Sequence, residues 1–244
     1  MKKKILIGIA ILIIFAIILC ILWKNGIILV NNPEEYGYTI KGVDVSSYQG
    51  EIDWNVLAKQ NIEFAFIKAT EGSSYVDENF KKNLEGAMKT DLLVGAYHFF
   101  SYDSTGEAQA NNFIKNVPKQ NNMLPPVIDI EFYGDKYKNI PDISTTQKEL
   151  TVMLERLEEY YEKKPIIYAT NKSYNLYIVD NFNDYYIWIR DIFKLPKLKD
   201  NREWTFWQYT DKAVLNGYKG KEDKIDINVF NGSIDELKKM TSIS

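Results

Sequence analysis

The stretch PPVIDIEFYG, residues 125–134, is an apolar run that carries two acids, Asp129 and Glu131. In a β-strand the side chains of residues i and i+2 lie on the same face, so these two carboxylates point the same way. Two carboxylates that share the face of an interior strand repel each other and lose hydration, so they need a compensating environment. We therefore expect the pair to face a cleft rather than a packed core.

Short β-rich runs recur along the chain on both sides of this stretch. There are eight of them: GVDVSS from Gly42, FAFIKAT from Phe64, LVGAYHFF from Leu93, PVIDIEF from Pro126, PIIYAT from Pro165, YYIWIR from Tyr185, WTFWQYT from Trp204 and KIDINVF from Lys224. Most are continuously apolar, which is typical of strands covered on both faces. Parallel strands of this kind place polar residues of several strand ends together at one rim.

Helical patterns separate the earlier strands but weaken in the last third. Asp77 precedes an amphipathic segment, and Ser144 with Gln147 forms a capping-box pattern ahead of another. The last four strands follow one another with weak helical periodicity between them. The pattern predicts an α/β protein with an irregular (β/α) barrel that is helix-poor in its last third.

The N-terminus predicts one transmembrane helix ahead of the barrel. Three lysines precede an uncharged run from Ile5 to Trp23, which as a helix spans about 28 Å, close to the thickness of a bilayer's hydrocarbon core. The lysines favour a cytoplasmic N-terminus. We expect residues 1–24 to be the lysines and a signal anchor, 25–38 a linker, and 39–244 the barrel. The alternatives are a cleaved signal peptide or a lipoprotein at Cys20, although no A-x-A-like cleavage site follows the run and no small residue precedes Cys20.

Composition excludes several kinds of site. The net charge of −3 does not predict a nucleic-acid partner, which normally requires a basic face. With one cysteine and one histidine, the chain lacks the ligands of an ordinary zinc site and cannot form an internal disulfide. A Ser-His-Asp triad could use only His98 as its base, and a cysteine nucleophile could only be Cys20. Carboxylate chemistry without a metal or cofactor is what remains.

The motifs together resemble glycoside hydrolase family 25, the Chalaropsis-type lysozymes. The residues that carry the resemblance run in the family's order from about Thr39 to Asn231: KGVDVSSYQGEIDW, FAFIKATEGSSYVDENFKKN, VGAYHFF, PPVIDIE, IIYAT, FWQYT and IDINVF. The resemblance implies an irregular β/α barrel that hydrolyses the β-1,4 bond between N-acetylmuramic acid and N-acetylglucosamine in peptidoglycan. It also implies that the acidic cluster consists of Asp129 and Glu131 of the D-x-E pair, Asp44 of GVDVS and Asp226 of DIN.

The resemblance and the chemistry of glycoside cleavage suggest a role for each acid. Glu131 is the candidate general acid, because nearby carboxylates and a partly dry cleft should raise its pKa. Asp129 would orient and stabilise the 2-acetamido group of the substrate if that group is the nucleophile. Asp226 could share this role or position water, and Asp44 could bind sugar hydroxyls or tune its neighbours. Substrate assistance and direct attack by water both stay open at this stage.

Further residues are candidates for binding the sugar. They are Tyr97, Tyr168, Trp188 and Trp207, which could stack on sugar rings, together with His98 and Glu71. Each also has a structural interpretation, because aromatic residues in strands usually belong to the core and His98 could be an internal hydrogen-bonding residue. Arg190 stands where members of the family commonly have a small residue. A cation there could contact an acidic group of the substrate or crowd the groove.

The expected partners are peptidoglycan glycan strands and, through residues 5–23, the cell membrane. The catalytic domain is expected outside the cell, as a monomeric ectodomain on a single-pass anchor, or secreted if the signal is cleaved. Tethering would suit local remodelling of the cell wall. Two other functions stay open: a catalytically inactive glycan-binding module, or a hydrolase of another N-acetylhexosamine polymer.

Overall fold

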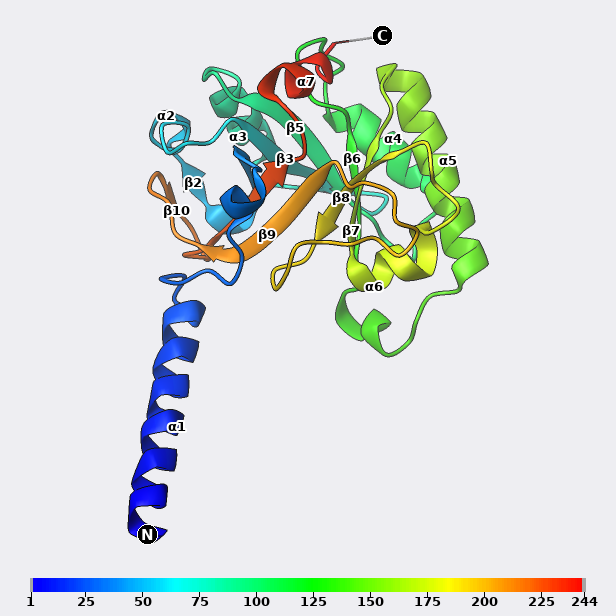
Figure 1. Cartoon of the computed structure of the whole chain (residues 1–244). Coiled ribbons are helices and arrows are strands. Elements are labelled where there is room, and N and C mark those ends of the chain that lie inside the picture. The colour runs from blue at the N-terminus through cyan, green and yellow to red at the C-terminus, as the bar shows by residue number, and fades with distance from the viewer. Residues whose placement is uncertain (1, 243–244) are drawn as a thin grey trace.

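A computed structural model describes residues 2–242 of the chain. Its most conspicuous feature is a single helix, α1 (Lys2–Lys24), that projects away from a barrel (Figure 1). None of the residues of α1 is buried, and the mean hydropathy of its most apolar window is 3.6. The helix is therefore long and apolar enough to cross a membrane, as the sequence predicted.

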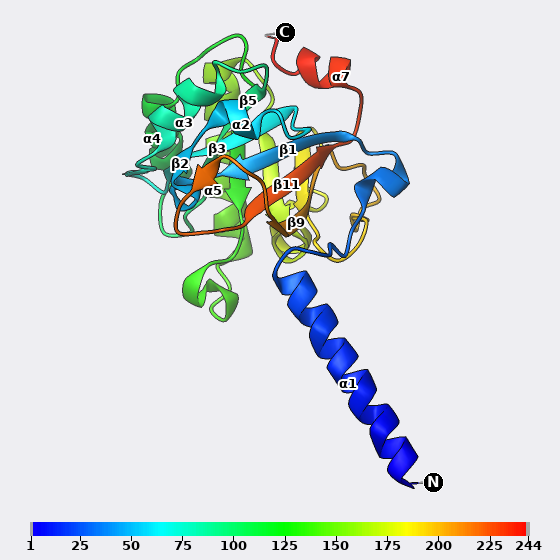
Figure 2. The same cartoon turned by 90° about the vertical axis from the view of Figure 1, so that its left-hand side faces the viewer.

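Eight strands close into a barrel, which confirms the predicted fold. They are β1 (Ile40–Val45), β3 (Phe64–Glu71), β5 (Leu93–Phe99), β6 (Val127–Ile130), β7 (Ile166–Thr170), β8 (Tyr186–Arg190), β9 (Phe206–Ala213) and β11 (Ile225–Phe230). Their order is β1-β11-β9-β8-β7-β6-β5-β3, and a parallel pairing of β1 with β3 completes the ring. All the strands run parallel except β11, which is antiparallel to both β1 and β9. This last strand therefore closes the barrel next to the first one, as Figure 2 shows.

Helices pack on the outside of the first half of the barrel. They are α2 (Trp54–Leu57), α3 (Phe80–Ala87), α4 (Gly106–Asn116) and α5 (Ile143–Tyr161), followed by the short α6 (Asn171–Ser173) and the C-terminal α7 (Ile234–Lys239). Within the described residues, no helix lies between β8 and β9 or between β9 and β11, so the last third is helix-poor as predicted. The expected capping box at Ser144 is wrong: Asp142 is the N-cap of α5, and its side chain accepts from the Thr145 N–H at 2.8 Å.

Several short elements complete the chain. They are β2 (Glu51–Ile52), which pairs with β10 (Tyr218–Lys219), β4 (Tyr75–Val76), and helical turns at Pro33–Tyr36, Ser47–Gln49, Gly134–Tyr137 and Tyr174–Ile178. Residues 25–38, expected to be the linker, connect α1 to β1 and contact the barrel. Asn31 is buried, and the Tyr38 ring lies 4.8 Å from that of Trp204.

The barrel interior is aromatic at one end and polar at the other. Phe66 on β3 stacks on Trp188 on β8 with ring centroids 4.8 Å apart, and Phe206 on β9 packs edge-on against Phe66. The inward position two residues later on β3 is Lys68, and on β9 it is Gln208. The aromatic layer therefore fills the barrel and forms the floor of a polar space at the carboxyl ends of the parallel strands.

Gly106, the first residue of α4, lies in close contact with α5, so a substitution there probes the packing of the two helices. A Cβ atom at this position would lie 1.9 Å from the backbone oxygen of Glu149 on α5, so alanine cannot fit unless the helices separate. We predict that Gly106→Ala lowers the free energy of unfolding by about 2 kcal/mol, as overpacked sites do, measured by denaturation of the full chain in detergent. Glu107→Ala, at the exposed neighbouring position, is the control and should change it by less than about 0.5 kcal/mol. Equal stability of the two variants would contradict the packing described.

Candidate active site

The polar end of the barrel holds a cavity of about 220 Å³. The residues that line it come from the ends of most barrel strands and from the Ser47–Gln49 turn: Asp44, Val45, Ser46, Tyr48, Gln49, Lys68, Tyr97, Phe99, Asp129, Glu131, Tyr168, Trp188, Gln208, Glu222 and Asp226. All four predicted catalytic acids are among them. Strands far apart in the sequence thus bring four carboxyl groups to one space.

Asp129 and Glu131 occupy the end of β6 and face the cavity together. Asp129 is 8% exposed, and its Oδ1 atom is buried without a hydrogen-bond partner among the described residues. Burial, reinforced by the charge of Glu131, raises the pKa of Asp129 well above its ordinary value. Burial also raises the pKa of Glu131, although the nearby positive charge of Arg190 reduces this rise. The two groups therefore titrate as a pair that keeps a proton to higher pH than isolated carboxyls do.

Asp44 and Asp226 form a second acidic pair across the β1–β11 ladder. They are direct partners in the antiparallel register, which places their side chains beside each other. Asp44 Oδ2 accepts hydrogen bonds from Asn228 Nδ2 at 2.8 Å and Gln208 Nε2 at 3.2 Å. Burial raises the pKa of Asp44 to about 6, although the hydrogen bonds from the two amides lower it. Burial, reinforced by the charge of Asp44, raises the pKa of Asp226 well above its ordinary value. The amide donors favour the charge on Asp44, so the proton of this pair belongs on Asp226.

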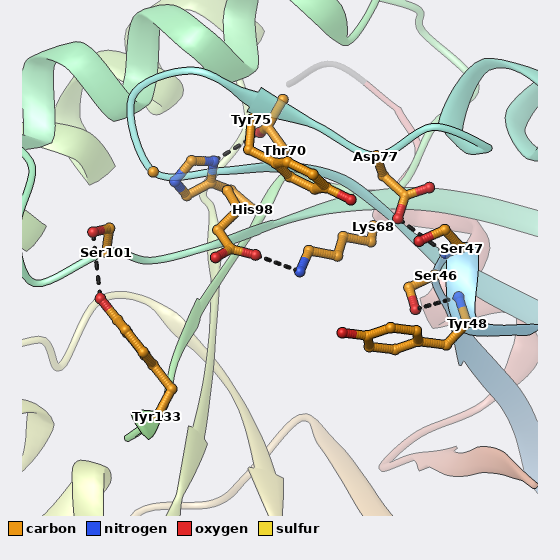
Figure 3. Close-up of polar contacts among 12 residues, drawn as sticks. Ser46, Ser47, Tyr48, Lys68, Thr70, Tyr75, Asp77, His98, Ser101 and Tyr133 are labelled. Atoms are coloured by element: carbon orange, nitrogen blue, oxygen red, sulfur yellow. Dashed lines mark hydrogen bonds and ion pairs between the residues drawn. The ribbon is translucent and has the colours of Figure 1, made fainter. Parts of the chain in front are cut away.

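Two cations border the acidic groups. Lys68 lines the cavity, donates to Glu71 Oε2 at 2.7 Å and lies 4.7 Å from the centre of the Phe99 ring. Figure 3 shows the Lys68 chain and the Tyr48 ring directed toward the same space. Arg190, at the end of β8, donates to Asp211 Oδ2 at 2.8 Å and lowers the pKa of Glu131 by its charge. Each cation is held by an acid outside the cavity, and its charge partly offsets the rise in the pKa values of Asp129 or Glu131.

Three of the predicted sugar-binding aromatic residues line the cavity. Tyr97 and Tyr168 lie on its wall, and Tyr168 donates from its hydroxyl to Gln208 Oε1 at 2.7 Å. Trp188 is 2% exposed and donates from its indole N–H to Asn228 Oδ1 at 2.8 Å. These bonds fix the amides of Gln208 and Asn228, which in turn donate to Asp44. Trp188 and Tyr168 thus support the acids as well as bordering the cavity.

His98 and Trp207, which the sequence offered as sugar-binding candidates, do not line the cavity. His98 is fully buried on the outer side of β5, where its Nδ1 lies 2.7 Å from Thr70 Oγ1 (Figure 3). Its Nε2 lies 3.1 Å from Gln109 Oε1. Burial lowers the pKa of His98 to about 4, so the ring is neutral. Trp207 is fully buried on the outer side of β9 and donates to the Asp191 backbone oxygen at 2.8 Å. Adjacent residues of a strand point to opposite faces. His98 follows the inward-facing Tyr97, and Trp207 precedes the inward-facing Gln208, so both point outward.

Glu71 does not line the cavity, although it lies near it. Its side chain is 41% exposed and pairs with Lys68, so it acts on the cavity through that lysine. Asn228, Gln208 and Tyr48 also contribute to the site, and none of the three was predicted to be a catalytic or sugar-binding residue. Asn228 follows Asp226 by two positions in DIN and Gln208 is polar within an apolar strand, so the i+2 rule could have placed each of them on an inward face.

No group of three or more histidine, cysteine, aspartate or glutamate side chains between residues 2 and 242 has a geometry suited to a metal ion. The cavity instead offers paired carboxyl groups with raised pKa values, fixed amides and aromatic walls. Paired carboxyls of this kind can donate a proton to a glycosidic oxygen and stabilise positive charge on a sugar ring.

Comparisons with known proteins agree on one family. The sequence model described as Glycosyl hydrolases family 25 matches residues 43–218. Among curated proteins, the uncharacterized protein YegX of Escherichia coli K12 is 35% identical over 206 residues, which cover 82% of this chain and 73% of YegX. Lysozyme M1 of Streptomyces globisporus is 32% identical over 210 residues, 81% of this chain and 70% of the lysozyme. A solved family 25 glycosyl hydrolase from Bacillus anthracis superposes with a TM-score of 0.80 at 57% identity, covering 83% of this chain and 94% of that one.

Because the pKa of Asp226 is raised in the folded protein, this group makes the protein less stable as pH rises. Above its ordinary pKa of 3.8 the group binds more protons in the folded than in the unfolded chain, so the free energy of unfolding falls as pH rises. We predict that Asp226→Asn makes this slope shallower above about pH 4 and stabilises the protein at pH 7, because the cost of ionising this buried carboxyl is removed. Part of the slope remains, since the pKa values of Asp44, Asp129 and Glu131 are raised as well. Chemical denaturation across this pH range measures it. Asp223→Asn, at a side chain that is 91% exposed, is the matched control and should leave the slope unchanged. A wild-type slope retained in Asp226→Asn would contradict the assignment.

Proposed function

Because this chain belongs to family 25 of the glycosyl hydrolases and is a peptidoglycan muramidase, we propose that Glu131 is its general acid. The reaction hydrolyses the β-1,4 bond between N-acetylmuramic acid and N-acetylglucosamine. Glu131 is half-buried at the end of β6 and faces the cavity, so it can reach a bound sugar more easily than Asp129 beneath it. Its raised pKa supports the role, because the acid must hold its proton until the leaving oxygen takes it.

Asp129 is proposed to orient the 2-acetamido group of N-acetylmuramic acid as the nucleophile. Its Oδ1 atom is buried and has no partner among the described residues, so an N–H of the substrate would supply the missing hydrogen bond. The acetamido oxygen would attack C1 as Glu131 protonates the leaving oxygen, and water would then open the resulting ring. Direct attack by water at C1 is the competing route.

Asp226 and Asp44 are proposed to assist from the opposite wall. Asp226, which carries the proton of its pair, would share the role of Asp129 or position the incoming water, while Asp44 stays bound to the amides of Gln208 and Asn228. Tyr97, Tyr168 and Trp188 border the space for the sugar rings. Trp188 is nearly inaccessible, so it would touch the ligand only at the floor of the cavity.

Membrane attachment through α1 is proposed as well. The helix is unburied, begins with lysines that favour a cytoplasmic N-terminus, and is apolar from Ile5 to Trp23. The barrel would then work outside the cell, on glycan within reach of the tether, which suits local remodelling of the wall. A helix near the N-terminus is also compatible with a signal peptide and secretion.

The observation that carries the catalytic proposal is the convergence of four carboxyl groups on one cavity. They come from β1, the end of β6 and β11, and two of them, Asp129 and Asp226, have strongly raised pKa values. A protein that only bound glycan would have no need to desolvate so many acids, because burial of unpaired carboxyls destabilises the fold.

We predict that Glu131→Gln lowers turnover of purified peptidoglycan by about 1,000-fold, because the leaving oxygen loses its proton donor. The assay follows new reducing ends and identifies by mass spectrometry whether they are muramic acid. The thermal melt should change little, because glutamine has the same shape. Glu203→Gln, at an exposed position, is the control and should keep full activity. A Glu131→Gln enzyme that retained most of its turnover would remove Glu131 from the role of acid.

Substrate assistance makes a separate prediction. Peptidoglycan whose muramic acid lacks its N-acetyl group should be cleaved at least about 100-fold more slowly, because the intramolecular nucleophile is gone. Peptidoglycan lacking the N-acetyl group only on glucosamine is the matched control substrate. Equal rates on intact and muramic-deacetylated wall would favour direct attack by water, with Asp129 in another role.

A further inference from the structure

The membrane-spanning helix ends in a fixed turn rather than a flexible spacer. Gly26 adopts the left-handed conformation with φ of +71°, its N–H donates to the Trp23 oxygen at 2.9 Å, and the Ile27 N–H donates to the Leu22 oxygen at 2.9 Å. These two bonds form a Schellman motif, which satisfies the last carbonyl groups of α1 and sets the direction of the chain that follows.

The end of α1 contacts the barrel at three places, all on one rim. Lys224 Nζ donates to the Asn25 oxygen at 3.1 Å, and a Cβ atom on Gly26 would lie 1.8 Å from the Lys212 oxygen. The Trp23 ring lies 6.2 Å from that of Phe193. Lys212 is near the end of β9, Lys224 immediately precedes β11, and Phe193 follows β8, so all three belong to the rim that carries the catalytic acids.

The chain after this turn is held to the same rim. Asn31 is buried, and its Nδ2 donates to the backbone oxygens of Asp191 at 3.3 Å and Tyr209 at 3.1 Å. Residues 25–31 are thus attached to the barrel at both ends. In Figures 1 and 2, α1 leaves the barrel on the side toward which the green loop after β6 also extends.

Exposed apolar side chains surround the point where α1 meets the barrel. We call them, with their exposed fractions, the rim patch: Ile27 69%, Ile28 39%, Leu29 39%, Val30 55%, Phe193 62% and Val214 59%. The patch is continuous with α1, because Phe193 adjoins Trp23 and a Cβ atom on Gly26 would lie 3.7 Å from a Val214 methyl group. Exposed apolar residues grouped in this way mark an interaction site rather than ordinary surface.

The charges around the rim patch are suited to an anionic partner. Lys194 and Lys212 lie one and two positions from Phe193 and Val214, and Lys24 lies three positions before Ile27. Lys224 reaches the same place through its contact with the Asn25 oxygen. Lys212 and Lys224 lie 3.5 and 3.6 Å from carboxylate oxygens of Asp211 and Asp223, so their charges are partly offset. Lys24 and Lys194 form no ion pair among the described residues, and they supply the free positive charge beside the patch. Lysines beside apolar and aromatic groups are typical of surfaces that insert into the headgroup layer of a membrane.

We propose that the rim patch docks on the outer surface of the membrane, with its apolar side chains in the headgroup layer and its lysines on anionic lipid. This rests on the proposed anchoring through α1. The apolar run Ile5–Trp23 spans about 28 Å, which matches the hydrocarbon core and brings Trp23 and the following residues to the interface. The barrel then has one orientation, with its catalytic rim on the membrane side, and acts on the glycan closest to the bilayer.

The test uses the full chain in vesicles of phosphatidylglycerol and phosphatidylethanolamine. In a Cys20→Ala background, nitroxide labels are placed singly at Phe193→Cys, Val214→Cys and Tyr186→Cys. Tyr186 is the matched control, since it is 40% exposed at the opposite end of β8. We expect the labels at 193 and 214 to lose access to a water-soluble nickel reagent and gain access to dissolved oxygen, while the label at 186 stays in water.

An alkaline wash of the same vesicles separates the two proposals. If the protein resists extraction but the labels at 193 and 214 are as accessible to nickel as that at 186, docking is overturned and anchoring stands. If the wash releases the protein, anchoring is overturned and docking falls with it.

Discussion

The antiparallel pairing of β11 with β1 is the constraint on which the site depends. It places Asp226 directly opposite Asp44 and inserts the last strand of the barrel beside the first. A parallel strand in that position would run the other way and carry the DIN segment to the opposite end of the barrel. Because β11 is reversed, its beginning rather than its end reaches the catalytic rim, and the carboxyl of Asp226 joins those of β1 and β6 there.

Burying four carboxyl groups in one cavity costs free energy, and the packing of the rest of the barrel compensates for it. Four carboxyl groups share a space whose floor is aromatic, so their charged forms are poorly solvated and their pKa values rise. The aromatic layer of Phe66, Trp188 and Phe206 prevents the polar end from collapsing and keeps water out from below. The fold therefore raises the pKa values of these acids, so that a proton is held for the leaving oxygen at higher pH than in water, beside carboxyl groups that can carry negative charge.

The strands of the barrel and the grouping of the acids could be predicted from the sequence, but not the direction of every side chain. The i+2 rule put Asp129 and Glu131 on one face, and the eight apolar runs corresponded to the eight barrel strands. His98 and Trp207 lie outside the cavity for one physical reason: each is next to an inward-facing residue, Tyr97 or Gln208, and a shift of one position reverses the face. Nor could the sequence show that Gln208 and Asn228 hold Asp44, because these contacts join segments more than 160 residues apart.

The neighbouring positions of the first and last strands also govern when the enzyme becomes able to act. Asp44 lies in a strand made early and Asp226 in one made near the end, so the pair cannot form until almost the whole polypeptide is available. A polypeptide that lacks the final strand has an open barrel and only one member of this acidic pair. The pairing of β11 with β1 therefore makes hydrolytic competence depend on completion of the whole barrel.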